Sequence, residues 1–180
     1  DDIEDTIENQ QFVNPEVLSE HFWNMFIVDA LLGNFDRHNG NWGFLVDPVT
    51  QKAEIAPIYD CGSCLLPQAD EKIMDLLLSD ADELNARIYR FPTSAIKENG
   101  KKINYYDFLT SAKNEDCNAA LLRIYPRIDM EEISSFIEET EELSFLQKSF
   151  YEKYLKERYE KILEPAYEQV QSQSRGMSLK

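Results

Sequence analysis

Three polar side chains in the first third of this sequence have the types and spacing for phosphoryl transfer. Asp36 and Asn41 lie five residues apart on a polar segment, residues 33–41, and Asp60 follows nineteen residues after Asn41. Phosphoryl transfer needs a carboxylate beside the acceptor hydroxyl and hard oxygen ligands for Mg²⁺ between the phosphates. The spacing therefore predicts a kinase-like site in which Asp36 orients the acceptor, while Asn41 and Asp60 hold Mg²⁺ and, through it, the nucleotide.

Three further residues of the same segment are expected to shape the loop. Arg37 and His38 are predicted to bond to backbone groups, and Gly40 to permit the chain reversal. Asp and Asn are common in turns, so this pattern alone would mean little. The order of the parts strengthens the prediction: an apolar helix, the polar loop, a strand, a turn, a second strand and then an aspartate.

The helix that must position the loop is apolar on almost every face. Hydrophobic side chains recur throughout residues 17–32, which is typical of a buried helix. Pro15 suits its first turn and Asn14 its N-cap, and Gly33 suits its C-cap. A core helix is therefore expected to end where the polar loop begins.

Two strand-like runs follow the loop. Residues 42–46 and 53–59 are rich in aromatic and branched side chains, and residues 47–52 between them have the composition of a turn. The predicted hairpin would carry the chain from Asn41 to Asp60.

The rest of the sequence is predicted to be helical. Helices are expected over residues 70–78, 105–112, 115–125, 130–138 and 143–171. Asn114 and Asp129 are plausible N-caps, and Pro165 is expected to kink the last helix. The predicted fold class is mainly α (α+β), with a small β-hairpin beside the catalytic loop. Residues 1–14 are interpreted as a connector, 15–171 as the folded lobe and 172–180 as a flexible tail.

Composition limits the classes of partner. A chain of 180 residues with 43% hydrophobic side chains suits one globular domain. Its net charge of −16, from 34 acidic and 18 basic residues, disfavours nucleic-acid binding and requires Mg²⁺ to neutralise a bound nucleotide. No transmembrane segment and no signal peptide are expected. A cytoplasmic location is predicted, with export to another cell left open.

The three cysteines are odd in number and form no dense framework, which favours a reducing compartment. Cys61 and Cys64 are spaced as C-x-x-C, a pattern found in redox and zinc sites. Only His21, His38 and Cys117 remain as further ligands, and two leucines and a proline follow the motif in place of a helix. The sequence therefore favours ordinary thiols beside the active loop over redox or metal chemistry.

Residues 22–66 resemble the C-terminal domain of HipA-like serine/threonine kinases, and the resemblance to the cell-translocating proinflammatory kinases of that group is especially close. The resemblance is carried there by residues 31–42 and 55–63, and it continues through residues 82–89, 102–109 and 123–130. It implies a mostly helical, protein-kinase-like C-lobe, with ATP as phosphoryl donor and a protein Ser/Thr as acceptor. It also implies that Asp36 is the catalytic base and that Asn41 and Asp60 ligate Mg²⁺.

The sequence departs from such kinases at its start. They carry an N-terminal lobe with a phosphate-covering loop and a lysine that reaches the nucleotide, but few residues precede Asp36 here and no glycine precedes Gly33. The missing N-lobe is therefore an expected partner, and the chain alone is expected to be inactive or nearly so.

Two alternatives stay open at this point. The D-R-H-x-x-N pattern also occurs in phosphoinositide kinases, so the lobe could phosphorylate a lipid or small molecule. It could also be a pseudokinase-like binding module that engages a protein through the tyrosines of its last helix. Those tyrosines are Tyr151, Tyr154, Tyr159 and Tyr167.

Overall fold

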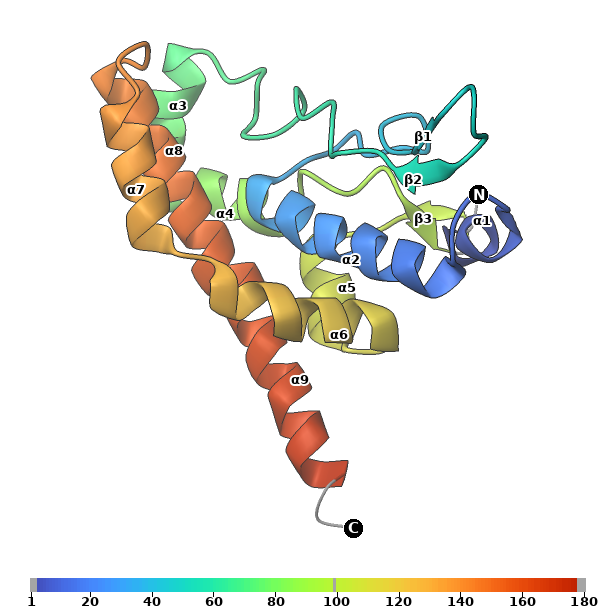
Figure 1. The fold of residues 1–180 in the computed structure, drawn as a ribbon. Helices are drawn as coiled ribbons and strands as arrows, with labels where there is room; N and C mark the ends of the chain where they lie inside the picture. Colours follow the sequence, from blue (N-terminus) through green and yellow to red (C-terminus); the bar gives the residue numbers. More distant parts are fainter. Residues whose placement is uncertain (1–2, 99, 178–180) are drawn as a thin grey trace.

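The computed structural model describes residues 3–98 and 100–177, which are mostly helical with two short antiparallel hairpins (Figure 1). This confirms the mainly α prediction, although only one hairpin was predicted. The helices are α1 (Ile3–Asn9), α2 (Pro15–Leu32), α3 (Glu71–Ser79), α4 (Ala81–Tyr89), α5 (Tyr105–Ser111), α6 (Glu115–Ile124), α7 (Met130–Glu139), α8 (Phe145–Arg158) and α9 (Glu164–Met177). The strands are β1 (Phe44–Val46), β2 (Ala53–Ile55), β3 (Lys97–Glu98) and β4 (Lys101–Lys102).

Helix α2 forms the centre of the core, as its apolar sequence predicted. The side chain of Asn14 accepts a hydrogen bond from the Glu16 amide at 2.8 Å and so caps the helix, with Pro15 in its first turn. Gly33 ends the helix with φ 67° and ψ 39°, a left-handed conformation that glycine adopts at little cost. In Figure 1, α2 crosses the middle of the molecule and points its C-terminal end toward α4 and α8.

The hairpin after the loop is shorter than predicted. Phe44 pairs with Ile55 and Val46 with Ala53, so the first two and the last four residues of the predicted strands lie outside the ladder. Trp42 is buried in the core rather than displayed on a strand. Pro57 has no N–H to donate to a ladder, which helps to explain the early end of β2.

The last helix is continuous but irregular. Between α8 and α9 the residues Tyr159–Leu163 form a π-helical turn, and the Glu164 amide bonds to the Tyr159 carbonyl five residues earlier. Pro165 follows directly, and its ring and missing N–H disfavour a regular α-helix at this point. The expected kink is thus observed as a widened turn. Helix α9 continues through residues 172–177 of the segment that was predicted to be a flexible tail, and residues 178–180 lie outside the described part.

Three elements were not predicted. Helix α1 lies within the segment interpreted as a connector and buries Ile3 and Ile7 against the lobe. Helix α4 begins after Asp80, whose carboxylate accepts hydrogen bonds from the next turn, and it buries Leu84 and Ile88. The third element is the β3–β4 hairpin.

The predicted helices around these elements are confirmed with small shifts at their ends, and Asn114 and Asp129 do cap α6 and α7. None of the helices in residues 3–98 and 100–177 is long and apolar enough to cross a membrane.

Candidate active site

The candidate site begins where α2 ends. A Cβ atom on Gly33 would lie 2.2 Å from the hydroxyl oxygen of Tyr154, which comes from α8. The close approach and the left-handed backbone together require glycine at this position. The loop therefore leaves α2 in a direction fixed by the packing of the C-terminal helix.

Asn34 is fully buried and holds the first residues of the loop. Its side-chain nitrogen donates to a carboxylate oxygen of Asp29 at 2.9 Å, and its side-chain oxygen accepts from the Asp36 amide at 3.1 Å. The Asn34 carbonyl accepts a hydrogen bond from the Tyr105 hydroxyl at 2.5 Å. These contacts fix the backbone on which Asp36 stands.

Arg37 and Asp29 form a buried ion pair beneath the loop. Arg37 Nε lies 2.9 Å from Asp29 Oδ2, and Nη2 lies 3.1 Å from Oδ1, which is a two-point contact. Burial alone would lower the pKa of Arg37, but the hydrogen bonds and charge of Asp29 outweigh it and raise that pKa above its usual value. The guanidinium is thus a permanent cation in the interior.

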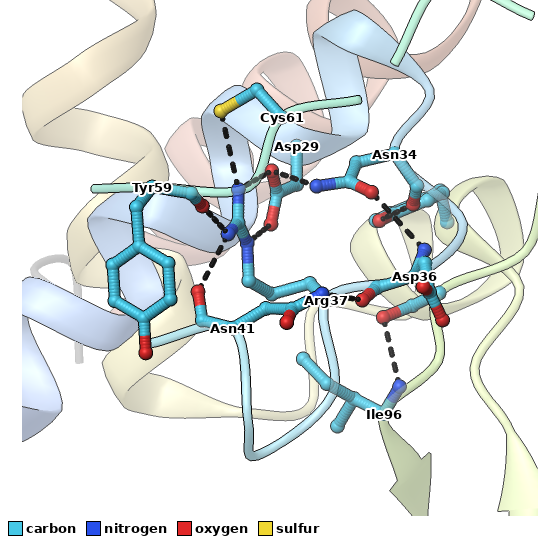
Figure 2. Close-up of polar contacts among 10 residues, drawn as sticks. Asp29, Asn34, Asp36, Arg37, Asn41, Tyr59, Cys61 and Ile96 are labelled. Atoms are coloured by element: carbon cyan, nitrogen blue, oxygen red, sulfur yellow. Dashed lines mark hydrogen bonds and ion pairs between the residues drawn. The ribbon is translucent and has the colours of Figure 1, made fainter. Parts of the chain in front are cut away.

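The same guanidinium joins two segments that lie far apart in the sequence (Figure 2). Its Nη1 donates to the Asn41 carbonyl at 2.7 Å and to the Tyr59 carbonyl at 2.5 Å, and Nη2 donates to the Cys61 sulfur at 3.6 Å. Arg37 therefore contacts both neighbours of Asp60 as well as Asn41. This brings the segments of all three predicted site residues into one cluster.

The three predicted site residues differ in exposure. Asp36 and Asp60 are exposed, whereas Asn41 is buried and its side-chain nitrogen donates to the Asp36 carbonyl at 2.8 Å. Asp60 has a left-handed backbone with φ 53°. Within the described residues no three His, Cys, Asp or Glu side chains lie together as a metal-binding group, so any metal site here would also need other ligands, such as the amide oxygen of Asn41.

His38 and Gly40 make the local contact predicted for the loop. The Gly40 amide donates to His38 Nδ1 at 2.9 Å, and Tyr59 donates its hydroxyl to the Gly40 carbonyl at 3.1 Å. Gly40 is not in the left-handed region, so chain reversal by unusual torsion angles does not explain it. A Cβ atom there would instead lie 2.9 Å from His38 Cε1, and glycine leaves room for the imidazole.

Some residues of the site escaped the sequence analysis. Asp29 is the one charged residue in the apolar run of residues 25–32, and a buried charge in such a run needs a partner. The sequence therefore carries a local signal for Asp29. Asn34 and Tyr105 gave no comparable signal, because their contact joins residues 71 positions apart.

A second buried arginine supports the helix that carries the loop. Arg158 in α8 is fully buried, and its Nε donates to the Ala30 carbonyl in the last turn of α2 at 2.8 Å. Its guanidinium lies over the ring of Tyr105 at 5.7 Å and that of Tyr154 at 5.5 Å. Aromatic faces attract such a cation. The C-terminal helix therefore fixes the end of α2.

The cysteines of the C-x-x-C motif lie at the edge of this cluster. Cys61 is exposed, Cys64 is partly buried, and both are free thiols. Burial, followed by the charge of Asp29 and the neighbouring Cys61, raises the pKa of Cys64 to about 12.

Comparison with known proteins shows similarity to a kinase. No protein-family model matches the chain. It is 57% identical over 162 residues to the serine/threonine-protein kinase CtkA of Helicobacter pylori strain J99, covering 89% of this chain and 50% of that protein. A crystal structure of a Helicobacter pylori proinflammatory kinase CtkA matches with a TM-score of 0.93 and 54% identity, over 96% of this chain and 63% of that chain.

The predicted similarity to a proinflammatory kinase is thus confirmed, and the chain spans about half the length of the curated relative that it matches. In sequence and in fold, nearly all of this chain is similar to part of the serine/threonine-protein kinase CtkA.

Proposed function

We propose that this chain is the C-terminal lobe of a HipA-like serine/threonine kinase and supplies the acceptor-orienting and metal-holding half of its site. The observation that carries the proposal is the bonding of one nitrogen of Arg37 to the backbones of both Asn41 and Tyr59. The similarity to a serine/threonine-protein kinase over most of the chain supports the reaction class.

In this proposal Asp36 orients the acceptor. Its carboxylate is exposed and can accept a hydrogen bond from a Ser or Thr hydroxyl of a protein substrate. Its backbone is held at the amide by Asn34 and at the carbonyl by Asn41. A base held in this way keeps the acceptor oxygen in line with the γ-phosphorus of ATP, which is where positioning accelerates transfer.

Asn41 and Asp60 are the proposed Mg²⁺ ligands. The nitrogen of the Asn41 side chain is engaged by the Asp36 carbonyl, which leaves Oδ1 as its ligand atom. Asp60 adds an exposed carboxylate, and these two hard oxygens fit Mg²⁺. Mg²⁺ would offset the negative charge of the phosphates, which a chain of net charge −16 otherwise repels.

Arg37 is the positioning residue of this arrangement. It touches Asn41 on one segment and the neighbours of Asp60 on the other, while Asp29 fixes its guanidinium from below. The separation of the two ligands thus depends on one buried side chain.

The proposed activity belongs to a protein with the full length of its relatives. Over residues 1–180 alone we expect weak nucleotide binding and little or no γ-phosphate transfer, because this chain spans about half the length of the curated kinase that it matches. The three free thiols support the proposed cytoplasmic location. Strong transfer by residues 1–180 that is lost in D36N would contradict the expected inactivity while supporting the reaction.

Mn²⁺ in place of Mg²⁺ tests the ligands directly on this chain. In the presence of ATP, paramagnetic broadening of amide NMR signals is expected around Asn41 and Asp60, and it should be lost in D60N and N41A. N39A is the matched control, because Asn39 is an exposed amide on the same loop. Broadening centred elsewhere, or unchanged in D60N, would refute the assignment.

A further inference from the structure

The C-x-x-C motif after Asp60 has a geometry that the proposed kinase chemistry does not use. The Cys64 amide donates to the Cys61 carbonyl at 3.1 Å, which closes a β-turn with Gly62 and Ser63 at its centre. The end Cα atoms of such a turn lie within about 7 Å of each other, and disulfides span about 4.4–6.8 Å. The backbone therefore holds the two cysteines near bridging distance before any oxidation.

The surroundings give the two thiols different roles. Cys61 is exposed and open to a dissolved oxidant, whereas Cys64 is partly covered behind it. The Cys61 sulfur also accepts a hydrogen bond from Arg37 Nη2 at 3.6 Å, a contact that limits where this sulfur can lie. Cys117 is 2% exposed and lies in the core, so it has no access to such an oxidant.

We propose that Cys61 and Cys64 form a reversible dithiol–disulfide pair that is oxidised by hydroperoxides. In the first step the O–O bond of the hydroperoxide breaks, Cys61 becomes a sulfenic acid, and water or an alcohol leaves. In the second step the sulfur of Cys64 attacks the Cys61 sulfur, the S–S bond forms, and the sulfenic oxygen leaves as water. Two thiols and one hydroperoxide thus give one disulfide, one water, and one further water or alcohol.

The proposal differs from the expectation drawn from sequence alone, which favoured ordinary thiols. The absence of a following helix argued against a thioredoxin-like arrangement, and that argument still holds, since residues 65–70 contain no helix. What carries the new proposal is the closed turn between an exposed and a half-covered thiol, which no helix needs to support.

The test treats the chain with hydrogen peroxide and maps the products by mass spectrometry. Cys61 and Cys64 lie on one tryptic peptide between Lys52 and Lys72, which is expected to lose two hydrogen atoms and to regain them with dithiothreitol. The peptide that carries Cys117 should stay reduced. The C117S variant is the control and should form the same bridge.

Trapping with dimedone identifies the order of the steps. In C64S and C64A the sulfenic acid of Cys61 has no partner and should accumulate as the dimedone adduct, whereas the adduct should be largely lost in the unsubstituted chain. Using two substitutions of Cys64 guards against one that misfolds, and circular dichroism checks both. Equal adduct levels with and without Cys64, oxidation of Cys117 first, or bridges only between molecules would each overturn the proposal. None of these readouts depends on kinase activity.

Discussion

At the scale of single residues, Arg37 and Asp29 determine the geometry of the candidate site. Their side chains are 0% and 3% exposed, and they connect α2 to both loops that carry the proposed metal ligands. A buried ion pair adds little net stability compared with an apolar pair, but a single partner left behind is costly. The pair therefore matters most for where the loops lie.

Replacing one member of this pair should destabilise the fold strongly. D29A leaves the buried guanidinium of Arg37 without its carboxylate, and we expect a loss of about 3–5 kcal/mol in the free energy of unfolding, measured with urea. The double variant D29A/R37A should lose less than the sum of the two single variants, because each single variant leaves an unpaired buried charge and the double variant leaves none. Additive losses would show that the pair is not coupled.

The surface pair Lys156–Glu160 provides the control for this prediction. These side chains are 68% and 48% exposed and lie 3.8 Å apart, so K156A should cost under about 1 kcal/mol.

At the scale of elements, the end of α2 depends on glycine for two separable reasons. In G33A the alanine must adopt a left-handed backbone conformation, which costs about 1–2 kcal/mol. Its Cβ atom also clashes with the hydroxyl oxygen of Tyr154. Overpacking adds about 1–3 kcal/mol. The combined loss should appear as a lower urea midpoint with an unchanged slope.

Gly100 separates the two causes. It also has a positive φ, 77°, but nothing lies within 4 Å of its missing Cβ. G100A should therefore show the backbone cost alone. In the Y154F background the cost of G33A should fall, because the oxygen in the clash is absent. An equal cost in both backgrounds would exclude the clash.

The turn of the β1–β2 hairpin should respond to acid. Hydrogen bonds from the Thr50 and Val49 amides lower the pKa of Asp47 below its ordinary value of 3.8. A carboxylate with a lowered folded-state pKa contributes stability above the unfolded pKa, and this contribution is lost as pH falls through the folded pKa. The stability difference between the unsubstituted chain and D47A should therefore be constant above about pH 5 and shrink below pH 3.8. A difference that grows in acid would contradict this sign.

The elements that the sequence predicted well are those with local signals. The apolar run of α2, its capping residues and the caps of α6 and α7 all act within a few residues, and each is observed. Helix α1 was missed because its two buried isoleucines stand among acidic residues that suggested a connector. The late start of strand β1 goes with the burial of Trp42, which no local pattern shows.

In the candidate site, too, the features with local signals could be predicted and those that depend on distant contacts could not. Asp36, Asn41 and Asp60 could be proposed from spacing, since their types match a known chemistry. The contacts that support these residues could not be predicted, because they join distant parts of the sequence. Asn34 bonds to Tyr105 across 71 residues, and Arg158 bonds to Ala30 across 128 residues. A single sequence without aligned relatives carries no record of such pairs.

At the scale of the whole molecule, excess negative charge opposes folding. The net charge of −16 causes self-repulsion that salt screens. Raising NaCl from about 0.01 M to about 1 M shortens the screening length from about 30 Å to about 3 Å. We expect the thermal midpoint to rise across this range, with KCl giving the same result. A falling midpoint would show that attractive pairs outweigh the repulsion.

The contact between Arg158 and the last turn of α2 also orders events during synthesis on the ribosome. The segment with Asp36 is translated before α8, and the side chains that contact Ala30 and Gly33 belong to α8, more than a hundred residues later. A nascent chain halted before α8 emerges would hold this loop without its support. The loop can therefore reach its final geometry only after α8 has emerged, and loss of α8 would affect it as directly as a change beside Asp36.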